Sequence, residues 1–252
     1  MLYLDCHTPA SALRSLTAAF HVREDVLVRA IRERSMEGDF TGEHEEQAVK
    51  AFLSEVNVEF DSTRFGGAYY FHGTRSFDPD SFLREGILPL GQVIERIWSS
   101  LYELIGDRIT ERDWQRFRAD LEGSGSGHSG FLYRHKVSNA SLHGPYALLV
   151  RGNHFNPGAI GCHDYLATPE IVQDIGRSFG HNLQEAFEAA SKKCIVKFRS
   201  PDVGKAAVIA AFWYVYSAIR SDHDPAGWAS LYGVDCKGSV APNDVVGVEQ
   251  LP

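Results

Sequence analysis

The sequence predicts an α+β protein, and three observations lead to that class. Strand-like runs rich in β-branched and aromatic residues are interspersed with longer stretches of helical periodicity. These segments do not alternate as a regular βαβ repeat, and the G-x-G-x-x-G fingerprint of a dinucleotide-binding α/β fold is missing. The chain has 252 residues, 44% of them hydrophobic, which is enough to bury a sizeable core.

Residues 1–60 are expected to form a helical N-terminal cap. Apolar residues recur at spacings of three to four along residues 10–55, with a break near residues 21–23. A second amphipathic stretch runs from about Glu43 to Val56. Two helices around a break can resemble a helix-turn-helix, but basic residues are not concentrated on them, which argues against that motif.

The main domain is expected to span residues 61–252 and to begin with a buried strand. The run from Ala68 to Phe71 holds three aromatic residues in a row, which favours a β-strand. A Phe-Asp-Pro-Asp turn should lead into a short helix that ends near Gly86. An amphipathic helix should follow, with its apolar face between Val93 and Leu104.

The middle of the chain supplies two more helices and one loop. A mostly polar helix is expected at about 110–121, and the Gly/Ser-rich stretch 123–130 is predicted to be a flexible surface loop. Thr168 as N-cap and Pro169 at the first helical position predict a helix that runs to about Phe179.

The remaining segments are read as strands, with one ambiguity. The apolar run 206–219 is compatible with a strand or a helix by periodicity alone. Strands are expected at residues 146–150, 193–198, 231–234 and 245–248.

Composition and charge exclude several classes of protein. The net charge of −8 argues against tight, non-specific binding to nucleic acid or to an anionic membrane. No apolar run has the length of a transmembrane helix, and the N-terminus lacks the features of a secretory signal. The four cysteines are scattered without a Cys-x-x-Cys pair, which is typical of reduced thiols. We therefore expect a cytoplasmic protein that does not bind membranes.

A polar cluster behind the first strand of the main domain is the strongest functional signal. His72, Thr74 and Arg75 bring an imidazole, a hydroxyl and a guanidinium to one point. Gly73 is expected to let the chain turn sharply there and to let another molecule approach the backbone. Because such groups are costly inside a core, we expect them on the rim of a pocket.

Three short motifs, taken in order, resemble a known family. His72-Gly73-Thr74 follows the aromatic strand, Gly86-Ile87 comes next, and Tyr165-Leu166-Ala167 then leads into a helix. In this order the motifs resemble the ADP-ribosyltransferase superfamily, in its poly(ADP-ribose)-polymerase-like or diphtheria-toxin-like branch. The resemblance covers about residues 66–250 and implies a split antiparallel β-sheet core, with a helical insertion at about 91–145.

The resemblance implies that the substrate is NAD and assigns a role to each residue of the cluster. His72 would bind the ribose next to adenine, and Gly73 would let the nicotinamide amide pair with the main chain. Thr74 and Arg75 would meet ribose or phosphate oxygens, since Arg suits phosphate through bidentate hydrogen bonds.

An aromatic wall would complete the implied site. Tyr165 or Phe179 would stack on the nicotinamide ring. The implied site must hold the nicotinamide ribose while the glycosidic bond loosens toward an oxocarbenium ion, and His72, Tyr165 and Glu249 are the residues expected to serve catalysis.

The implied acidic residue is less well defined by the motifs. Many members of the superfamily carry a Glu just before a late strand, where it engages the ribose and activates the acceptor. Ser230 stands at that place in this chain. Glu249 on the last expected strand is the nearest acidic candidate, and Asp222 and Asp224 are others.

The residues leave two further functions open. Among eleven histidines, a ribonuclease or another nucleic-acid-processing enzyme could use His72 with His143, His154 or His163 as acid and base. A non-catalytic nucleotide-binding module is the other alternative. No metal site is expected, because the histidines lack the i, i+4 spacing and the H-E-x-x-H pattern of common zinc sites.

The leading hypothesis is an NAD-dependent ADP-ribosyltransferase that modifies a protein or nucleic-acid acceptor. By analogy with the family, we expect a bacterial toxin or antiphage effector, with an antitoxin or another regulatory protein as a possible partner.

Overall fold

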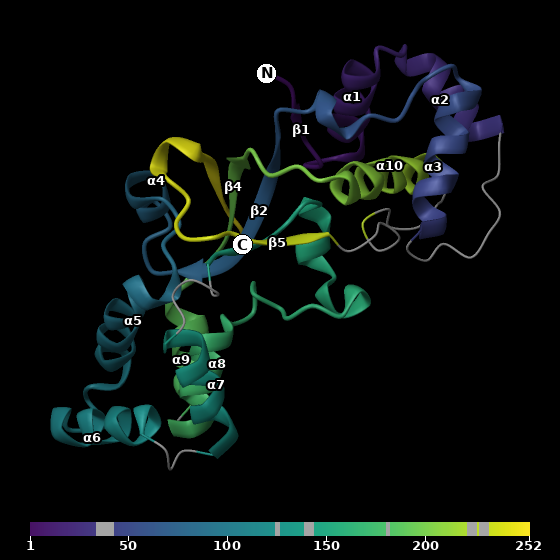
Figure 1. The fold of residues 1–252 in the computed structure, drawn as a ribbon. Coiled ribbons are helices and arrows are strands. Elements are labelled where there is room, and N and C mark those ends of the chain that lie inside the picture. Colours follow the sequence, from purple (N-terminus) through teal and green to yellow (C-terminus); the bar gives the residue numbers. More distant parts are fainter. Residues whose placement is uncertain (34–42, 124–126, 139–143, 180–181, 221–225, 227–231) are drawn as a thin grey trace. The chain divides into compact units, whose positions relative to one another are not determined.

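The computed structural model describes residues 1–33, 43–123, 127–138, 144–179, 182–220, 226 and 232–252. The protein combines helices with a six-stranded sheet, so the α+β class is confirmed (Figure 1). Within the described residues, no helix has the length and apolar character needed to cross a membrane.

The sheet is organised around β2 (Gly67–Ser76). Its strand order is β5 (Gly233–Asp235), β3 (Tyr146–Leu148), β2, β4 (Lys192–Ser200), β6 (Val245–Gln250), with β1 (Tyr3–Leu4) also paired to β2. β1 runs parallel to β2, whereas β3 runs antiparallel to it, with Phe71 opposite Leu148. The strands expected near residues 68, 146, 193 and 245 are therefore confirmed. Of the strand expected at 231–234, residues 233 and 234 lie in β5, and residue 231 lies outside the described residues.

The expected turn at Gly73 is wrong, because β2 continues through this residue to Ser76. Gly73 is buried and does not have a positive φ. β3 and β4 lie on either side of β2 in the sheet, where they offer hydrogen-bond partners to its backbone. A turn at Gly73 would leave those backbone groups without partners, so the strand persists.

The chain divides into two compact units, which are described separately. The first unit comprises Met1–Phe71, Leu148–Cys162 and Phe198–Val234, and the second comprises His72–Ala147, His163–Lys197 and Asp235–Pro252. This grouping differs from the expected division at residue 60, because the N-terminal helices share a unit with segments from the middle and the end of the chain.

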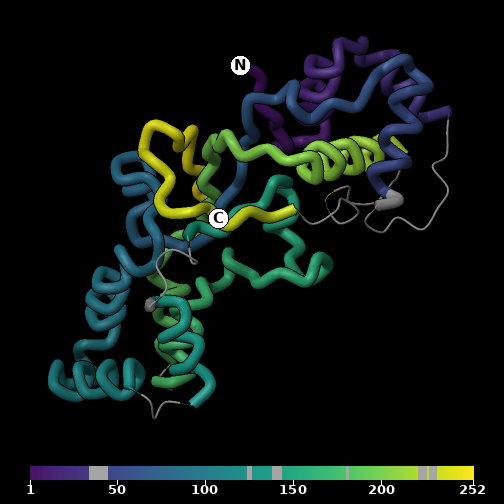
Figure 2. The backbone as a smooth tube through the Cα atoms, in the orientation of Figure 1, coloured from purple at the N-terminus to yellow at the C-terminus, as the bar shows by residue number. Residues whose placement is uncertain are grey.

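The first unit is built around α10 (Lys205–Arg220), which is contacted by α1 (Pro9–Phe20), α2 (Glu24–Glu33) and α3 (Glu43–Glu55). The tube in Figure 2 shows α10 in light green among these N-terminal helices. Every residue of α10 from Ala207 to Val215 is buried, as is typical of a helix that lies inside a core. The apolar run 206–219 is thus a helix.

The second unit contains six α-helices among its described residues. The expected short helix, amphipathic helix and polar helix are confirmed as α4 (Ser81–Glu85), α5 (Leu90–Ile105) and α6 (Glu111–Glu122). α7 (Gly127–Ser138), α8 (Glu170–Phe179) and α9 (Leu183–Ala190) complete the set. α8 contacts both α7 and α9, and α5 contacts α7 and α9 (Figure 1).

The loop expected at residues 123–130 is wrong in its second half. Residues 127–130 form the first turn of α7, while residues 124–126 lie outside the described residues. Gly130 and Tyr133 are buried, and α7 packs against α8. Packing of this kind stabilises a helix that starts with residues of low helix propensity.

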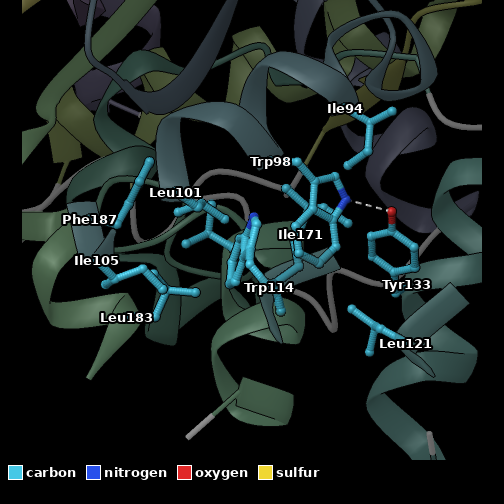
Figure 3. Packing of buried hydrophobic residues seen from close by; sticks show 12 residues of the cluster. Ile94, Trp98, Leu101, Ile105, Trp114, Leu121, Tyr133, Ile171, Leu183 and Phe187 are labelled. Carbon is cyan, nitrogen blue, oxygen red and sulfur yellow. Dashed lines mark hydrogen bonds between the residues drawn. The ribbon is translucent and has the colours of Figure 1, made fainter. Parts of the chain in front are cut away.

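An aromatic cluster forms the core of the second unit (Figure 3). Trp98 of α5 packs edge-on against Trp114 of α6, with ring centroids 5.0 Å apart. The indole N–H of Trp98 donates to the Tyr133 hydroxyl over 2.8 Å, and that hydroxyl donates to a Glu122 oxygen over 3.2 Å. Burial raises the pKa of Tyr133 to about 12, so its hydroxyl keeps its proton and can donate. α5, α6 and α7 thus share one core with α8 and α9.

The importance of this core can be tested by truncating Leu101, which is fully buried. We expect Leu101→Ala to lower the free energy of unfolding by about 2–5 kcal/mol, because it removes buried surface and leaves a cavity. Leu83→Ala is the matched control, since Leu83 is 47% exposed. Urea denaturation of both variants measures the difference, and equal losses would contradict the assigned core.

Candidate functional site

A pocket of about 630 Å³ lies within the second unit and contains the predicted polar cluster. His72, Thr74 and Arg75 line it from β2, Tyr146 from β3, and Tyr165 from the segment before α8. Its volume falls in the usual range for small-molecule and cofactor sites. The expectation that the cluster borders a pocket is therefore confirmed.

Helix α5 forms one wall of the pocket and at the same time belongs to the core. Val93 and Ile97 line the pocket, and Ile97 also packs against the core cluster, in which Ile94, Trp98 and Leu101 are buried. Positions three and four apart share a helix face, so the two sets mark two adjacent faces. The sequence pattern alone predicts a single apolar face that contains both sets of residues.

His72 is half-buried, and the hydrogen bond it makes determines its tautomer. Its Nδ1 lies 2.7 Å from the carbonyl oxygen of Tyr146. Because a carbonyl only accepts, Nδ1 carries the hydrogen. Burial lowers the pKa of His72 below its ordinary value of 6.5, although the bond to Tyr146 opposes the shift. The neutral ring therefore offers Nε2 as an acceptor, and no described residue hydrogen-bonds to that atom.

Arg75 is bound by the protein rather than presented as a free cation. Its Nε donates to the Ser191 hydroxyl over 3.0 Å, and Nη1 donates to the Leu166 carbonyl over 3.1 Å. Its Nη2 donates to the carbonyls of Ser191 and Glu188. Those two carbonyls lie at the C-terminal end of α9, where a helix carries partial negative charge. Arg75 thus joins β2 to α9 and to the segment that carries Tyr165.

The family resemblance would place a strand at residues 165–167, but these residues form a turn. The Asp164 carboxylate accepts the backbone N–H groups of Leu166 and Ala167 over 3.1 and 2.9 Å. Such local bonds satisfy the backbone without a neighbouring strand. The turn leaves the Tyr165 ring 5.8 Å from that of Tyr146, and both rings line the pocket.

Thr168 does not serve as the side-chain cap that the sequence predicts for α8. Its hydroxyl donates to the Glu188 carboxylate and accepts from Gln184, both on α9. Burial opposes ionisation of Glu188, but hydrogen bonds from Thr168 and Gln184 and the charge of Arg75 hold its pKa below the usual range. The Thr168 hydroxyl therefore connects α9 to the start of α8. This helix begins at Glu170, one residue after the Pro169 that the sequence predicts as its first position.

The other predicted site residues are not in the pocket. Phe179 packs against Trp114 and Phe117 in the aromatic cluster, with centroids 5.2 and 4.9 Å apart. Glu249 is half-buried on β6, and Gly73 is buried within β2; neither lines the pocket. The candidates at 143, 222, 224 and 230 lie outside the described residues.

The pocket contains charged residues that the motifs did not indicate. Glu170 lines it and contacts the Lys136 amine at 3.1 Å, while the same amine lies 2.8 Å from the buried Asp174. Arg96 and Glu85 also line the pocket and form an ion pair at 2.6 Å. In the sequence, the only indication of this pair is its i, i+4 spacing on an expected helix, which places the carboxylates of Glu170 and Asp174 on the same helix face.

The histidines proposed for the nuclease alternative have other partners. His154, in the first unit, contacts the Phe71 carbonyl through Nε2, and His163 contacts the Thr168 carbonyl through Nε2. Of the described histidines, His72 and His135 line the pocket. Within the described part of the chain, no group of three or more His, Cys, Asp or Glu side chains could hold a metal ion.

Comparison with known proteins adds no relative: no protein-family model, no curated protein and no solved structure matches the chain. The interpretation of the pocket therefore depends on its own residues.

Replacing Arg75 tests its role in joining three segments. We expect Arg75→Lys to lower the free energy of unfolding by about 2–4 kcal/mol, because an ammonium cannot reproduce the fork of bonds to separate carbonyls. Arg84→Lys, at an exposed ion pair with Asp78, should change it by less than about 0.5 kcal/mol. Chemical denaturation provides the comparison, and equal effects would refute the structural role of Arg75.

The lowered pKa of His72 makes stability depend on pH with a defined sign. Between its folded pKa and 6.5, the unfolded chain binds more protons at this residue than the folded protein. The contribution of His72 to stability is therefore present above that window and is lost as the pH falls through it. Urea denaturation between about pH 7.5 and about pH 5 should show a smaller loss in His72→Asn. An unchanged pH dependence would contradict the assignment.

Proposed function

We propose that the pocket binds NAD and that the protein transfers ADP-ribose from it to a protein or nucleic-acid acceptor. One observation carries the proposal: a single pocket receives His72 and Thr74 from one motif and Tyr165 from the other, although the two motifs lie far apart in the sequence. The resemblance to the ADP-ribosyltransferase superfamily relies on these same two motifs.

The lining of the pocket suits a nucleotide that has both aromatic and hydroxyl groups. The rings of Tyr146 and Tyr165 offer flat apolar surface for a nicotinamide or adenine ring. His72 Nε2, as an acceptor, suits the hydroxyl group of a ribose, which can donate. The Thr74 hydroxyl can either donate or accept next to it.

The chemistry requires the bond between nicotinamide nitrogen and ribose C1 to break. The electron pair of this bond leaves with nicotinamide, and the ribose develops positive charge until an acceptor nucleophile attacks C1. A carboxylate near that charge lowers the barrier, and the acceptor's proton needs a base. Glu170 is the pocket carboxylate on the segment that also carries Tyr165, so we propose it for this role in place of Glu249.

The biological role follows from the family resemblance alone. We propose a toxin or antiphage effector whose NAD-consuming activity is controlled by an antitoxin or another regulatory protein. The acceptor would be found by tracing labelled ADP-ribose in a cell lysate.

The function is tested by measuring nicotinamide release from NAD by the purified protein with a lysate as the source of acceptors. We expect release by the wild type and a loss of about a hundredfold in His72→Ala, because the ribose loses its anchor. His128→Ala, at an exposed histidine outside the pocket, is the matched control and should retain full activity.

Two outcomes would count against the proposal. If the wild type releases no nicotinamide and labels neither protein nor nucleic acid, it is not an ADP-ribosyltransferase. If it cleaves RNA without NAD, the nuclease alternative takes its place.

A further inference from the structure

Among the described residues, three side chains with positive charge line the pocket, and they differ in how many hydrogen bonds and ion pairs they make with the protein. Arg75 donates to four oxygen atoms. Lys136 is 18% exposed and lies between the carboxylates of Glu170 and Asp174. Arg96 is 54% exposed and has one ion pair, from Nη1 to Glu85. Its Nε and Nη2 have no partner among the described residues.

The start of α5 adds a second positive element to the same wall. Pro89 occupies the N-cap and has no side-chain acceptor for the free N–H groups of the first turn. Leu88 and Leu90 on either side of it line the pocket, so this helix end borders the cavity. Helix N-termini carry partial positive charge and favour anions.

The position of Arg96 allows the two elements to act together. Arg96 follows Leu90 by less than two helical turns, and side chains on a helix lean toward its N-terminus. The guanidinium is thus carried toward the uncapped end of α5. With Nη1 bound to Glu85, the guanidinium keeps one free edge, formed by Nε and Nη2, which matches the paired oxygens of a phosphate group.

We propose that Arg96 and the first turn of α5 form a subsite for the diphosphate of the ligand. Glu85 orients the guanidinium in the free protein through Nη1, while Nε and Nη2 face a phosphate. Exposed ion pairs contribute little to stability, so Glu85 can share or yield Arg96 at small cost. The identity of the complete ligand rests on the proposed function, but diphosphate binding does not require any transfer reaction.

The subsite changes which residue is expected to recognise phosphate. The sequence motif assigns that role to Arg75, whose donors are directed to Ser191, Leu166 and Glu188. Arg96 lies outside the motifs, on a helix whose sequence pattern is explained by packing alone. Only its presence in the pocket wall distinguishes it from other surface arginines.

The chain offers a closely matched control for Arg96. Arg84 of α4 forms an ion pair with Asp78 in which both side chains are also exposed. Arg84 does not line the pocket, whereas Arg96 does. Replacing either arginine by glutamine removes one exposed charge and one exposed ion pair, so a difference between the variants reports on the pocket.

The test is calorimetric titration of wild type, Arg96→Gln, Arg84→Gln and Glu85→Gln with ADP-ribose, adenosine and inorganic pyrophosphate. We expect Arg96→Gln to weaken ADP-ribose binding by about tenfold or more, with adenosine affinity unchanged. Arg84→Gln should bind ADP-ribose like the wild type, and Glu85→Gln should bind it more tightly, since it removes the carboxylate charge that competes with a phosphate for Arg96. Thermal unfolding of each variant confirms that it is folded.

Each result decides the proposal. Equal ADP-ribose affinities of Arg96→Gln and Arg84→Gln would overturn the subsite and leave the proposed function standing. Arg96-dependent pyrophosphate binding in a protein that binds no ADP-ribose would support the subsite and argue against NAD as substrate. A folded wild type that binds neither diphosphate would refute the subsite.

Discussion

The geometry of the pocket depends on the guanidinium of Arg75. This one group, at the end of β2, binds carbonyl oxygens at the end of α9 and in the turn that carries Tyr165. These carbonyls lie where regular secondary structure ends, so few other donors are available to them. A cation at a helix C-terminus is also favoured by the helix dipole. Without Arg75, the end of α9 and the turn that carries Tyr165 would lose their common link to β2.

The same arrangement explains how the pocket divides its polar residues between structure and binding. Arg75 and the Thr168 hydroxyl are directed to the protein itself, and Lys136 neutralises the buried Asp174. His72 uses one nitrogen for the Tyr146 carbonyl and leaves the other for a ligand. Among the described groups left with free capacity are His72 Nε2 and part of the Arg96 guanidinium. Hydrogen-bond partners, rather than residue type, therefore separate supporting residues from candidate binding residues.

The aromatic cluster shows how the second unit supports a pocket on one of its helices. The face of α5 with Trp98 is fixed by contacts to α6 and α7, so the adjoining face with Val93 and Ile97 is held as a wall. The family resemblance suggested that the Phe179 ring stacks on the ligand, but this ring packs against Phe117 in the cluster instead. The apolar face of an amphipathic helix packs on the core, and Phe179 packs there together with Ile171 and Ile175 of α8.

The sequence by itself determined the α+β class, the positions of most helices and strands, and a polar cluster that borders a pocket. These features follow from local periodicity and from the cost of burying polar groups, which can be read from neighbouring residues. Only the tertiary structure decided that β2 continues through Gly73, that residues 165–167 form a turn, and that the run 206–219 is a helix. It also decided that Arg75 is held by carbonyls while Arg96 keeps free donors. Such outcomes depend on partners distant in sequence, whose positions no local pattern contains.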